Sequence, residues 1–205
     1  MRAHQSYGNL QKYQSKNLFV RILLNRFLKE IVLLFDFIDV KKVLDFGCGE
    51  GFVINKLLGY YPHLEITGVD IDADALDLAQ RLNPGTEFIR EDIYTFSCEK
   101  KSFDLVMAIE VLEHMEKPEG VLRSIKEITS RYALFSVPNE PFFRISNFIR
   151  CKNFFRLGND PEHLQNWSKG QFLRLLEKNG FKILKTATPF PWIVVLTEIG
   201  TIDTP

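Results

Sequence analysis

Three glycines alternate with other residues in the segment GCGEG at 47–51, directly after the apolar run at 42–46. Glycines in this pattern allow a tight turn and let the backbone come close to a bound ligand. The spacing is G-x-G-x-G, whereas the fingerprint of dinucleotide-binding folds is G-x-G-x-x-G. Asp45 and Glu50 add negative charge beside the turn, which would repel a phosphate and favour a cation. The segment therefore predicts a site for a positively charged ligand.

A further carboxylate, Asp70, ends the second apolar run at 65–70. It lies about 20 residues beyond the glycine turn, the distance at which related folds place an acid that accepts hydrogen bonds from ribose hydroxyls. Asp72 is better placed than Asp70 to cap the helix expected at 72–82. Asp70 is therefore expected to bind a ribose.

A third group, formed by Glu110, Glu113 and His114, follows the apolar run at 103–109. On a helix, positions i, i+3 and i+4 share one face, so these side chains are expected to converge, with His163 as a fourth candidate. Such a set suits Mg²⁺, Mn²⁺, Fe²⁺ or Zn²⁺, and a metal would lower the pKa of a bound hydroxyl. In the alternative, Glu110 contacts the ligand, Glu113 is solvated, and His114 shapes the pocket or acts alone as a base.

These groups require elements that bring them together. Apolar residues at 19, 22, 23, 27, 31, 34, 35 and 38 predict a first helix with one apolar face. Short apolar runs then alternate with helical periodicity, which predicts a mostly parallel sheet with helices on both faces and ligands at the carboxyl ends of the strands. The last two runs are too close for a parallel crossover and should form an antiparallel hairpin. The expected strands are 42–46, 65–70, 86–89, 103–109, 132–137, 181–186 and 192–197, and the later helices are 51–60, 72–82, 117–129 and 168–179.

The composition excludes several classes of protein. The chain has 205 residues, with 26 basic and 26 acidic side chains, which argues against a uniformly basic nucleic-acid binder. Three cysteines without a C-x-x-C pair argue against a disulfide framework and fit a reducing cytoplasm. The longest apolar stretch, 18–40, contains charged residues and does not predict a membrane span.

Residues 138–167 are the least regular part of the sequence, and 141–157 combines five phenylalanines with four basic residues and no acid. Three interpretations remain open. The segment could form a lid over the ligand pocket, or a helix with a solvated basic face. It could also contact RNA or an anionic headgroup.

The chain resembles the class I S-adenosylmethionine (SAM)-dependent methyltransferases. The resemblance rests on VLDFGCGEG at 43–51, GVDID at 68–72, EDI at 91–93 and FDLVMAIEVLEH at 103–114. It implies a Rossmann-like α/β fold with strand order 3-2-1-4-5-7-6 and an antiparallel strand seven. Residues 41–205 would form the methyltransferase domain, with 138–167 as its lid or insertion, after an N-terminal helical segment at 1–40.

The resemblance also implies roles for individual residues. Asp45 would hold the methionine ammonium of SAM, and Asp92 would accept a hydrogen bond from the adenine amino group while Ile93 packs on the ring. Glu113, His114 and His163 are the catalytic candidates, with His114 the first candidate base. The cofactor-binding candidates are Asp45, Gly47, Cys48, Gly49, Asp70, Ile71, Asp92, Ile93, Ile109 and Glu110, and the metal candidates are Glu110, Glu113, His114 and His163.

The E-x-x-E-H run at 110–114 is similar to that of two groups, the ubiquinone-biosynthesis O-methyltransferases and the RNA 3′-terminal 2′-O-methyltransferases. The expected function is O-methylation of a small molecule, with a base or a divalent metal activating the acceptor. Methylation of an RNA end is the first alternative, and a SAM-binding protein without turnover is the second. A dinucleotide-dependent oxidoreductase is disfavoured by the acids and the glycine spacing. The sequence does not indicate an oligomeric state.

Overall fold

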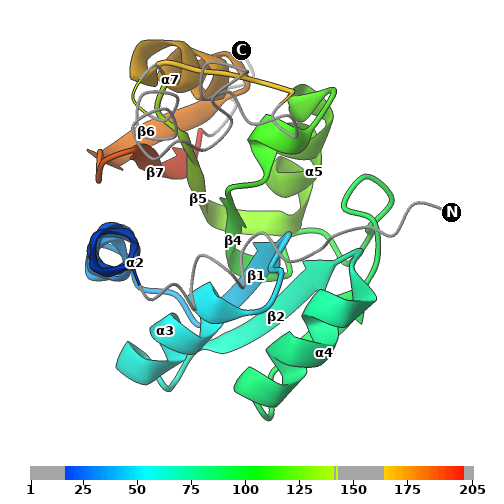
Figure 1. The fold of residues 1–205 in the computed structure, drawn as a ribbon. Coiled ribbons are helices and arrows are strands. Elements are labelled where there is room, and N and C mark those ends of the chain that lie inside the picture. The colour runs from blue at the N-terminus through cyan, green and yellow to red at the C-terminus, as the bar shows by residue number, and fades with distance from the viewer. Residues whose placement is uncertain (1–16, 141, 143–163, 201–205) are drawn as a thin grey trace, which may run out of the picture.

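The computed structural model describes residues 17–140, 142 and 164–200, and their core is one seven-stranded sheet. The strand order is β3-β2-β1-β4-β5-β7-β6. Neighbouring strands from β3 to β5 pair in parallel, while β7 pairs antiparallel with both β5 and β6. The expected strand order and the antiparallel hairpin at the end of the chain are therefore confirmed (Figure 1).

The elements agree with the expected ranges to within a few residues. The strands are β1 (Lys42–Phe46), β2 (Glu65–Asp70), β3 (Glu87–Arg90), β4 (Phe103–Ile109), β5 (Thr129–Pro138), β6 (Phe181–Ala187) and β7 (Trp192–Ile199). The helices are α2 (Leu18–Phe35), α3 (Phe52–Tyr60), α4 (Ala73–Leu82), α5 (Pro118–Ile128) and α7 (Lys169–Lys178), with a short 3-10 helix, η1, at Leu112–His114.

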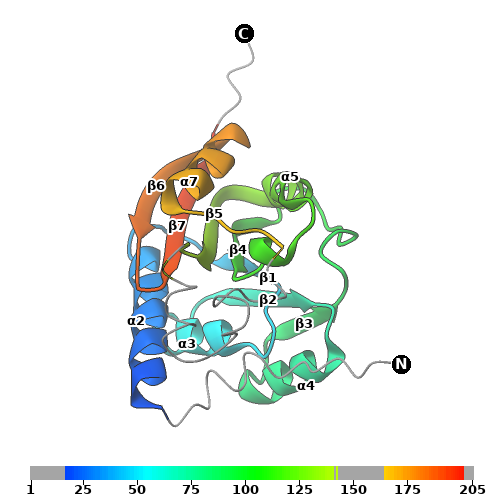
Figure 2. The same cartoon turned by 45° about the horizontal axis from the view of Figure 1, so that its top comes forward.

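Helices cover both faces of the sheet and form two apolar cores. Successive residues of β4 point to opposite faces, so Leu105 and Met107 pack with α2 and α3, whereas Val106 packs with α5 and α7. Helix α4 lies beside α3, against β2 and β3 (Figure 2). Because the central strands are buried on both faces, they hold the loops at their ends in fixed positions.

Helix α2 buries five of the residues expected to form its apolar face, Leu23, Phe27, Ile31, Leu34 and Phe35, but the buried stripe is shifted at its start. Phe19 and Ile22 are 52% and 45% exposed, whereas Val20, Leu24 and Leu28 are buried. The buried stripe includes the i, i+4 row that starts at Val20 as well as the row through Leu23 and Phe27, and the helix packs against β7 and α3. The helix belongs to the same apolar core as β1, β4 and β7, while the expected domain boundary at residue 40 stays a prediction.

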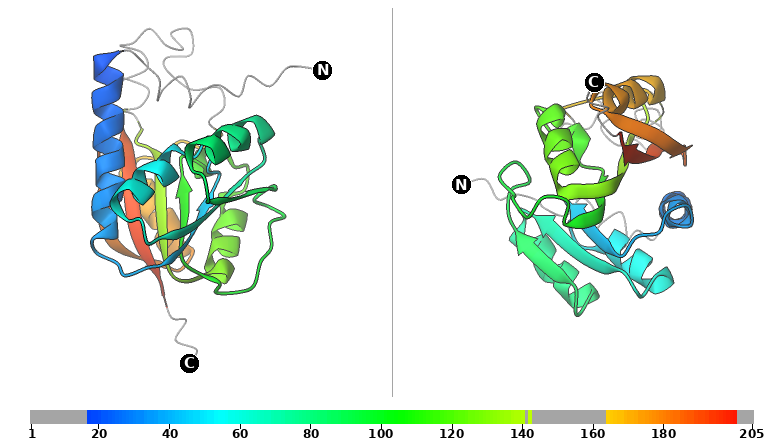
Figure 3. Two further views of the ribbon diagram at one scale, coloured as in Figure 1. Left: turned by 90° about the horizontal axis from the view of Figure 1, so that it is seen from below. Right: turned by 180° about the vertical axis from the view of Figure 1, so that it is seen from behind.

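The carboxyl ends of the parallel strands meet at one edge of the sheet. The beginning of β7 lies at this edge too, because Trp192 pairs with Pro138 at the end of β5. The N-terminal end of α2 lies at the same end of the molecule (Figure 3, left). Most of the segment at 138–167, including His163, lies outside the described residues. Within the described ranges, no helix has the length and apolar character that crossing a membrane requires.

Candidate functional site

The glycine turn between β1 and α3 adopts a conformation that requires glycine. Gly47, Gly49 and Gly51 have φ values of +69°, +50° and +73°. The amides of Gly47 and Cys48 both donate to the carbonyl of Val69, at 2.8 and 3.1 Å, which ties the turn to β2. A Cβ at Gly47 would lie 2.6 Å from Cγ2 of Val111. Positive φ and close packing thus explain this alternation of glycines.

Asp70 fixes the turn from the end of β2. Its Oδ2 accepts the amide of Gly49 at 2.8 Å, and its Oδ1 accepts the amide of Asp72 at 3.0 Å. Asp72 in turn caps α4 by accepting the amides of Asp74 and Ala75, as the sequence predicted. The Asp70 carboxylate therefore has a fixed orientation, and each of its oxygens retains capacity for a second hydrogen bond.

Asp45 is a buried acid in the same site. The residue is 2% exposed, and its Oδ1 has no hydrogen-bond partner among the described residues. Burial, with a smaller effect from the negative charge of Asp70, raises the pKa of Asp45 to about 8. A small cavity of about 50 Å³ beside Asp45 is also lined by Phe27, Gly47, Ile109 and Glu110. An unpaired buried carboxyl group at a cavity favours a ligand that brings a positive charge or a hydrogen-bond donor.

Glu110 follows β4 in a strained conformation. Its φ is +58°, which is uncommon for a residue other than glycine, and its amide donates to the carbonyl and to the hydroxyl of Ser136. The carboxylate of Glu110 accepts hydrogen bonds from Oγ of Ser136 at 3.0 Å and from Nε1 of Trp192 at 2.7 Å. Neither Ser136 nor Trp192 is among the site residues expected from the sequence, although Trp192 begins the last apolar run.

The expected helical arrangement of Glu110, Glu113 and His114 is not formed. Glu110 precedes η1 in a left-handed conformation, so the i, i+3, i+4 geometry of an α-helix does not apply. Glu113 is buried rather than solvated, and its carbonyl accepts the amides of Leu164 and Gln165. The described part of the chain contains no group of three or more His, Cys, Asp or Glu side chains that could hold a metal ion. His163 lies outside that part.

The remaining candidates lie around the same edge of the sheet. Asp92 follows β3, and its carboxylate accepts the amide of Tyr94 at 2.9 Å. Ile93 and Ile109 are buried at 8% and 9% exposure, whereas Ile71 is 61% exposed. Ile93 packs in the core between the sheet and α5.

Cys48 is half-buried in the glycine turn, and burial raises the pKa of its thiol, with smaller effects from neighbouring carboxylates. Such a thiol remains protonated, which agrees with a packing role and not with that of a nucleophile.

Asn83 is a third residue of the site that the sequence did not indicate, after Ser136 and Trp192. It is 3% exposed, and its Nδ2 donates to the carbonyl of Gly51 and to that of Ala79, both at 3.1 Å. A Cβ at Gly51 would lie 2.7 Å from this nitrogen. Asn83 therefore connects the start of α3 to the end of α4 and stabilises the last residue of the glycine turn.

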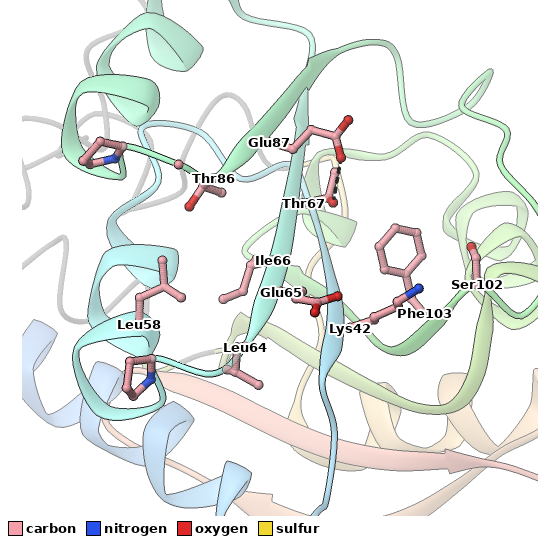
Figure 4. A pocket seen from close by; sticks show the side chains of 13 residues that line it. Lys42, Leu58, Leu64, Glu65, Ile66, Thr67, Thr86, Glu87, Ser102 and Phe103 are labelled. Atoms are coloured by element: carbon pink, nitrogen blue, oxygen red, sulfur yellow. Dashed lines mark hydrogen bonds between the residues drawn. The ribbon is translucent and has the colours of Figure 1, made fainter.

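A larger hollow lies at the opposite end of the strands. Its volume is about 700 Å³, and it is lined by residues at the beginnings of β1 to β4 and by the preceding loops (Figure 4). Thr67 and Glu87 are neighbours on β2 and β3 in its lining, and the hydroxyl of Thr67 donates to the carboxylate of Glu87 at 3.2 Å. None of the expected site residues lines this hollow. The glycine turn and its acids are at the other edge of the sheet, where open α/β sheets bind ligands.

The chain is similar to a known family and to several characterised proteins. The family described as "Methyltransferase domain" matches residues 17–186. The demethylmenaquinone methyltransferase of Thermotoga maritima is 31% identical over 138 residues, which cover 60% of each chain. The ubiquinone biosynthesis O-methyltransferase of Glaesserella parasuis is 33% identical over 106 residues, 47% of this chain and 44% of that one.

Two further comparisons bear on the substrate and the fold. The small RNA 2′-O-methyltransferase of Xenopus tropicalis is 27% identical over 151 residues, 64% of this chain and 39% of that one. The chain thus spans 60% or less of the length of these three relatives. Among solved structures, a plantazolicin methyltransferase in complex with S-adenosylhomocysteine (SAH) has the same fold, with a TM-score of 0.74 and 17% identity, covering 96% of this chain and 90% of that one.

Proposed function

The chain belongs to the methyltransferase domain family, and we propose from this premise that it transfers the methyl group of SAM to an oxygen of a small-molecule acceptor. The observation that carries the proposal is the glycine turn with the buried Asp45 beside it. SAM carries a sulfonium and an ammonium and no phosphate, so it matches a site lined by acids. The relative named as a ubiquinone biosynthesis O-methyltransferase supports an oxygen acceptor.

The described residues divide the binding of SAM among three strand ends. Asp45 would accept the ammonium group, and Asp70 would accept the ribose hydroxyls with the oxygen capacity left by Gly49 and Asp72. Asp92 would accept the adenine amino group. Gly47, Cys48 and Gly49 would lie along the ligand, with Ile71 and Ile93 near the base and Ile109 and Glu110 near the methionine.

SAM supplies an electrophilic methyl group on its sulfonium. The contribution of the protein is to align the acceptor with that group and to exclude water from it. An oxygen acceptor must also lose its proton, for which His114 is the first candidate base and His163 the second. The predicted ligands of a divalent metal are Glu110, Glu113, His114 and His163, and a metal held there would lower the pKa of the acceptor hydroxyl. Within the described residues, no group of three or more such side chains is formed.

The function is tested by measuring SAM binding by calorimetry and SAH formation with a panel of acceptors. The panel contains a catechol, an aliphatic carboxylic acid and a short single-stranded RNA. Tight binding of SAM with turnover of the catechol supports the proposal. Binding of NADH in preference to SAM, or SAM binding without turnover of any acceptor, contradicts it.

Methylation of a ribose at an RNA end is the second candidate function. The similarity to the small RNA methyltransferase of Xenopus tropicalis and the E-x-x-E-H run at 110–114 favour it. Turnover of the RNA and of no other acceptor would identify RNA, and not a small molecule, as the substrate. Stimulation by Mn²⁺ and loss of activity with a chelator would support the predicted metal ligands.

SAM binding is expected to release a proton near pH 7. With a pKa of about 8, Asp45 is mostly protonated at pH 7 in the free protein, and a bound ammonium favours the carboxylate. The affinity should therefore rise between pH 6 and pH 8, by up to about tenfold per unit, and level off above. Calorimetry at pH 7 in two buffers of different ionisation enthalpy measures the released proton directly. Equal binding enthalpies in the two buffers would contradict the assignment of Asp45.

Replacing His114 by alanine is expected to lower kcat by about 10²–10⁴-fold while leaving the SAM dissociation constant nearly unchanged, because a general base acts on the acceptor. His63 provides a matched control, since it is exposed in the loop before β2. His63→Ala should leave both quantities unchanged. If His114→Ala turns over the acceptor as fast as the wild type, His114 is not the base.

A further inference from the structure

Trp192 connects the carboxylate of Glu110 to the N-terminal helix. The indole is 8% exposed, and its Nε1 donates to Oε2 of Glu110 at 2.7 Å. This distance is at the short end for an N–H donor and is typical of a hydrogen bond to an ionised carboxylate. Trp192 is the first residue of β7, so its backbone is held by pairing with Pro138 of β5.

The other side of the indole packs on α2. The ring centroids of Trp192 and Phe27 are 4.8 Å apart, with an angle of 37° between the rings. Phe27 is 2% exposed and lines the small cavity that Asp45, Ile109 and Glu110 also line. Helix α2 runs beside β7 in each view of the fold (Figures 1 and 3). A residue of α2 is therefore part of the wall of the site.

Glu110 needs such support because of its backbone. A non-glycine residue with positive φ costs about 1–3 kcal/mol and persists only where its surroundings hold it. Here the amide and one carboxylate oxygen of Glu110 bind Ser136, and the other oxygen binds Trp192. The two partners come from different strands, β5 and β7, so the direction of the carboxylate depends on how these strands and α2 pack together.

We propose that Trp192 is a positioning residue, which holds the Glu110 carboxylate at the methyl-transfer end of the site and makes that position depend on the packing of α2 through Phe27. The proposal rests on the proposed function, which places Glu110 near the methionine part of SAM, from which the methyl group is transferred. It extends the site from the strand ends to helix α2, which is separated from the glycine turn by strand β1.

The hydrogen bond itself can be observed without an acceptor. The chain has two tryptophans, so a ¹⁵N–¹H spectrum of the whole protein contains two indole signals, and Trp192→Phe identifies one of them. We expect the Trp192 signal to lie downfield, to move upfield in Glu110→Gln, and to shift again on saturation with SAH. The Trp167 signal serves as an internal reference. A Trp192 signal that responds to neither change overturns the proposal.

The effect on turnover separates positioning from simple packing. We expect Trp192→Phe to lower kcat by about tenfold and the SAM affinity by less than about threefold, because phenylalanine keeps an aromatic ring beside Phe27 but has no N–H donor for Glu110. Glu110→Gln combined with Trp192→Phe should be no worse than Glu110→Gln alone, since both act through one carboxylate. Additive losses overturn the proposal, as does a kcat of Trp192→Phe equal to that of the wild type.

One control variant and one further test variant separate the role of Trp192 from a general loss of stability. Phe181→Leu truncates a buried ring on the opposite face of the sheet, packed on Phe135, and should reduce the unfolding temperature without changing kcat. Phe27→Ala should lower kcat and move the Trp192 signal, because it removes the contact with α2. If the wild type neither binds SAM nor forms SAH, the proposed function fails. If the wild type is active and the variants match it, only the role of Trp192 fails.

Discussion

Replacing Asp45 by asparagine is expected to stabilise the free protein and to weaken SAM binding at the same time. The carboxyl group is buried with one unpaired oxygen, and its pKa in the folded state is about 8, compared with about 4 in an unfolded chain. The folded protein therefore binds more protons than the unfolded chain between these two values. The free energy of unfolding should therefore fall as the pH rises from 4 to 8, because the folded state must take up a proton that the unfolded chain has released.

The side chain of asparagine has no proton that dissociates between pH 4 and pH 8, so the variant should lack this decline in stability. At pH 7 the free energy of unfolding should increase by roughly 2–4 kcal/mol, which for a domain of this size raises Tm by about 5–10 °C. The loss of the ammonium partner should weaken SAM binding by about 10- to 100-fold, the range for a hydrogen bond to a charged group.

Thermal unfolding from pH 5 to pH 8, with and without SAM, measures both effects. Asp77→Asn is the matched control, because Asp77 is exposed on α4 away from the turn. That variant should keep the pH dependence of the wild type. An Asp45→Asn protein with the same decline in stability and the same SAM affinity would show that Asp45 is neither a buried acid nor a ligand of SAM.

Replacing Gly49 by valine is expected to reduce SAM affinity by at least about 100-fold. Gly49 has a φ of +50°, where a β-branched residue is strained by about 1–3 kcal/mol, and its amide donates to Asp70. A side chain here would both displace the Asp70 carboxylate and occupy the face of the turn on which a ligand must lie. Both effects should weaken SAM binding more than they lower the stability of the fold.

Calorimetric titration with SAM and SAH checks this expectation. Gly59 offers the control, since a Cβ there would meet nothing within 4 Å and its backbone is helical. Gly59→Ala should leave the affinity unchanged and add about 0.5–1 kcal/mol to the stability. Should Gly49→Val fail to fold, Gly49→Ala serves in its place. Wild-type affinity in a folded Gly49 variant would mean that the ligand does not contact this turn.

Much of the fold could be predicted because its signals are local. The alternation of short apolar runs with helical periods predicts β1 to β5 and the helices between them, and a gap of five residues at 187–191 predicts the antiparallel hairpin. The strand order came from the resemblance and is confirmed. The strand ends that carry Asp45, Asp70 and Asp92 follow from the same periodicity, since a carboxylate after a buried run must lie at the edge of the sheet.

Local patterns in the chain thus predicted the strands, the glycine turn and the acids beside it, because each depends on residues that are close together in the sequence. The packing of α2 against β7 and α3 added Val20 and Leu24 to the predicted buried face and left Phe19 and Ile22 exposed, which periodicity did not predict. Tertiary structure also decided that Glu110 lies outside a helix, held by Ser136 and Trp192 from strands far along the chain. Periodicity does not encode such distant contacts, because they form only when the strands are assembled in their order.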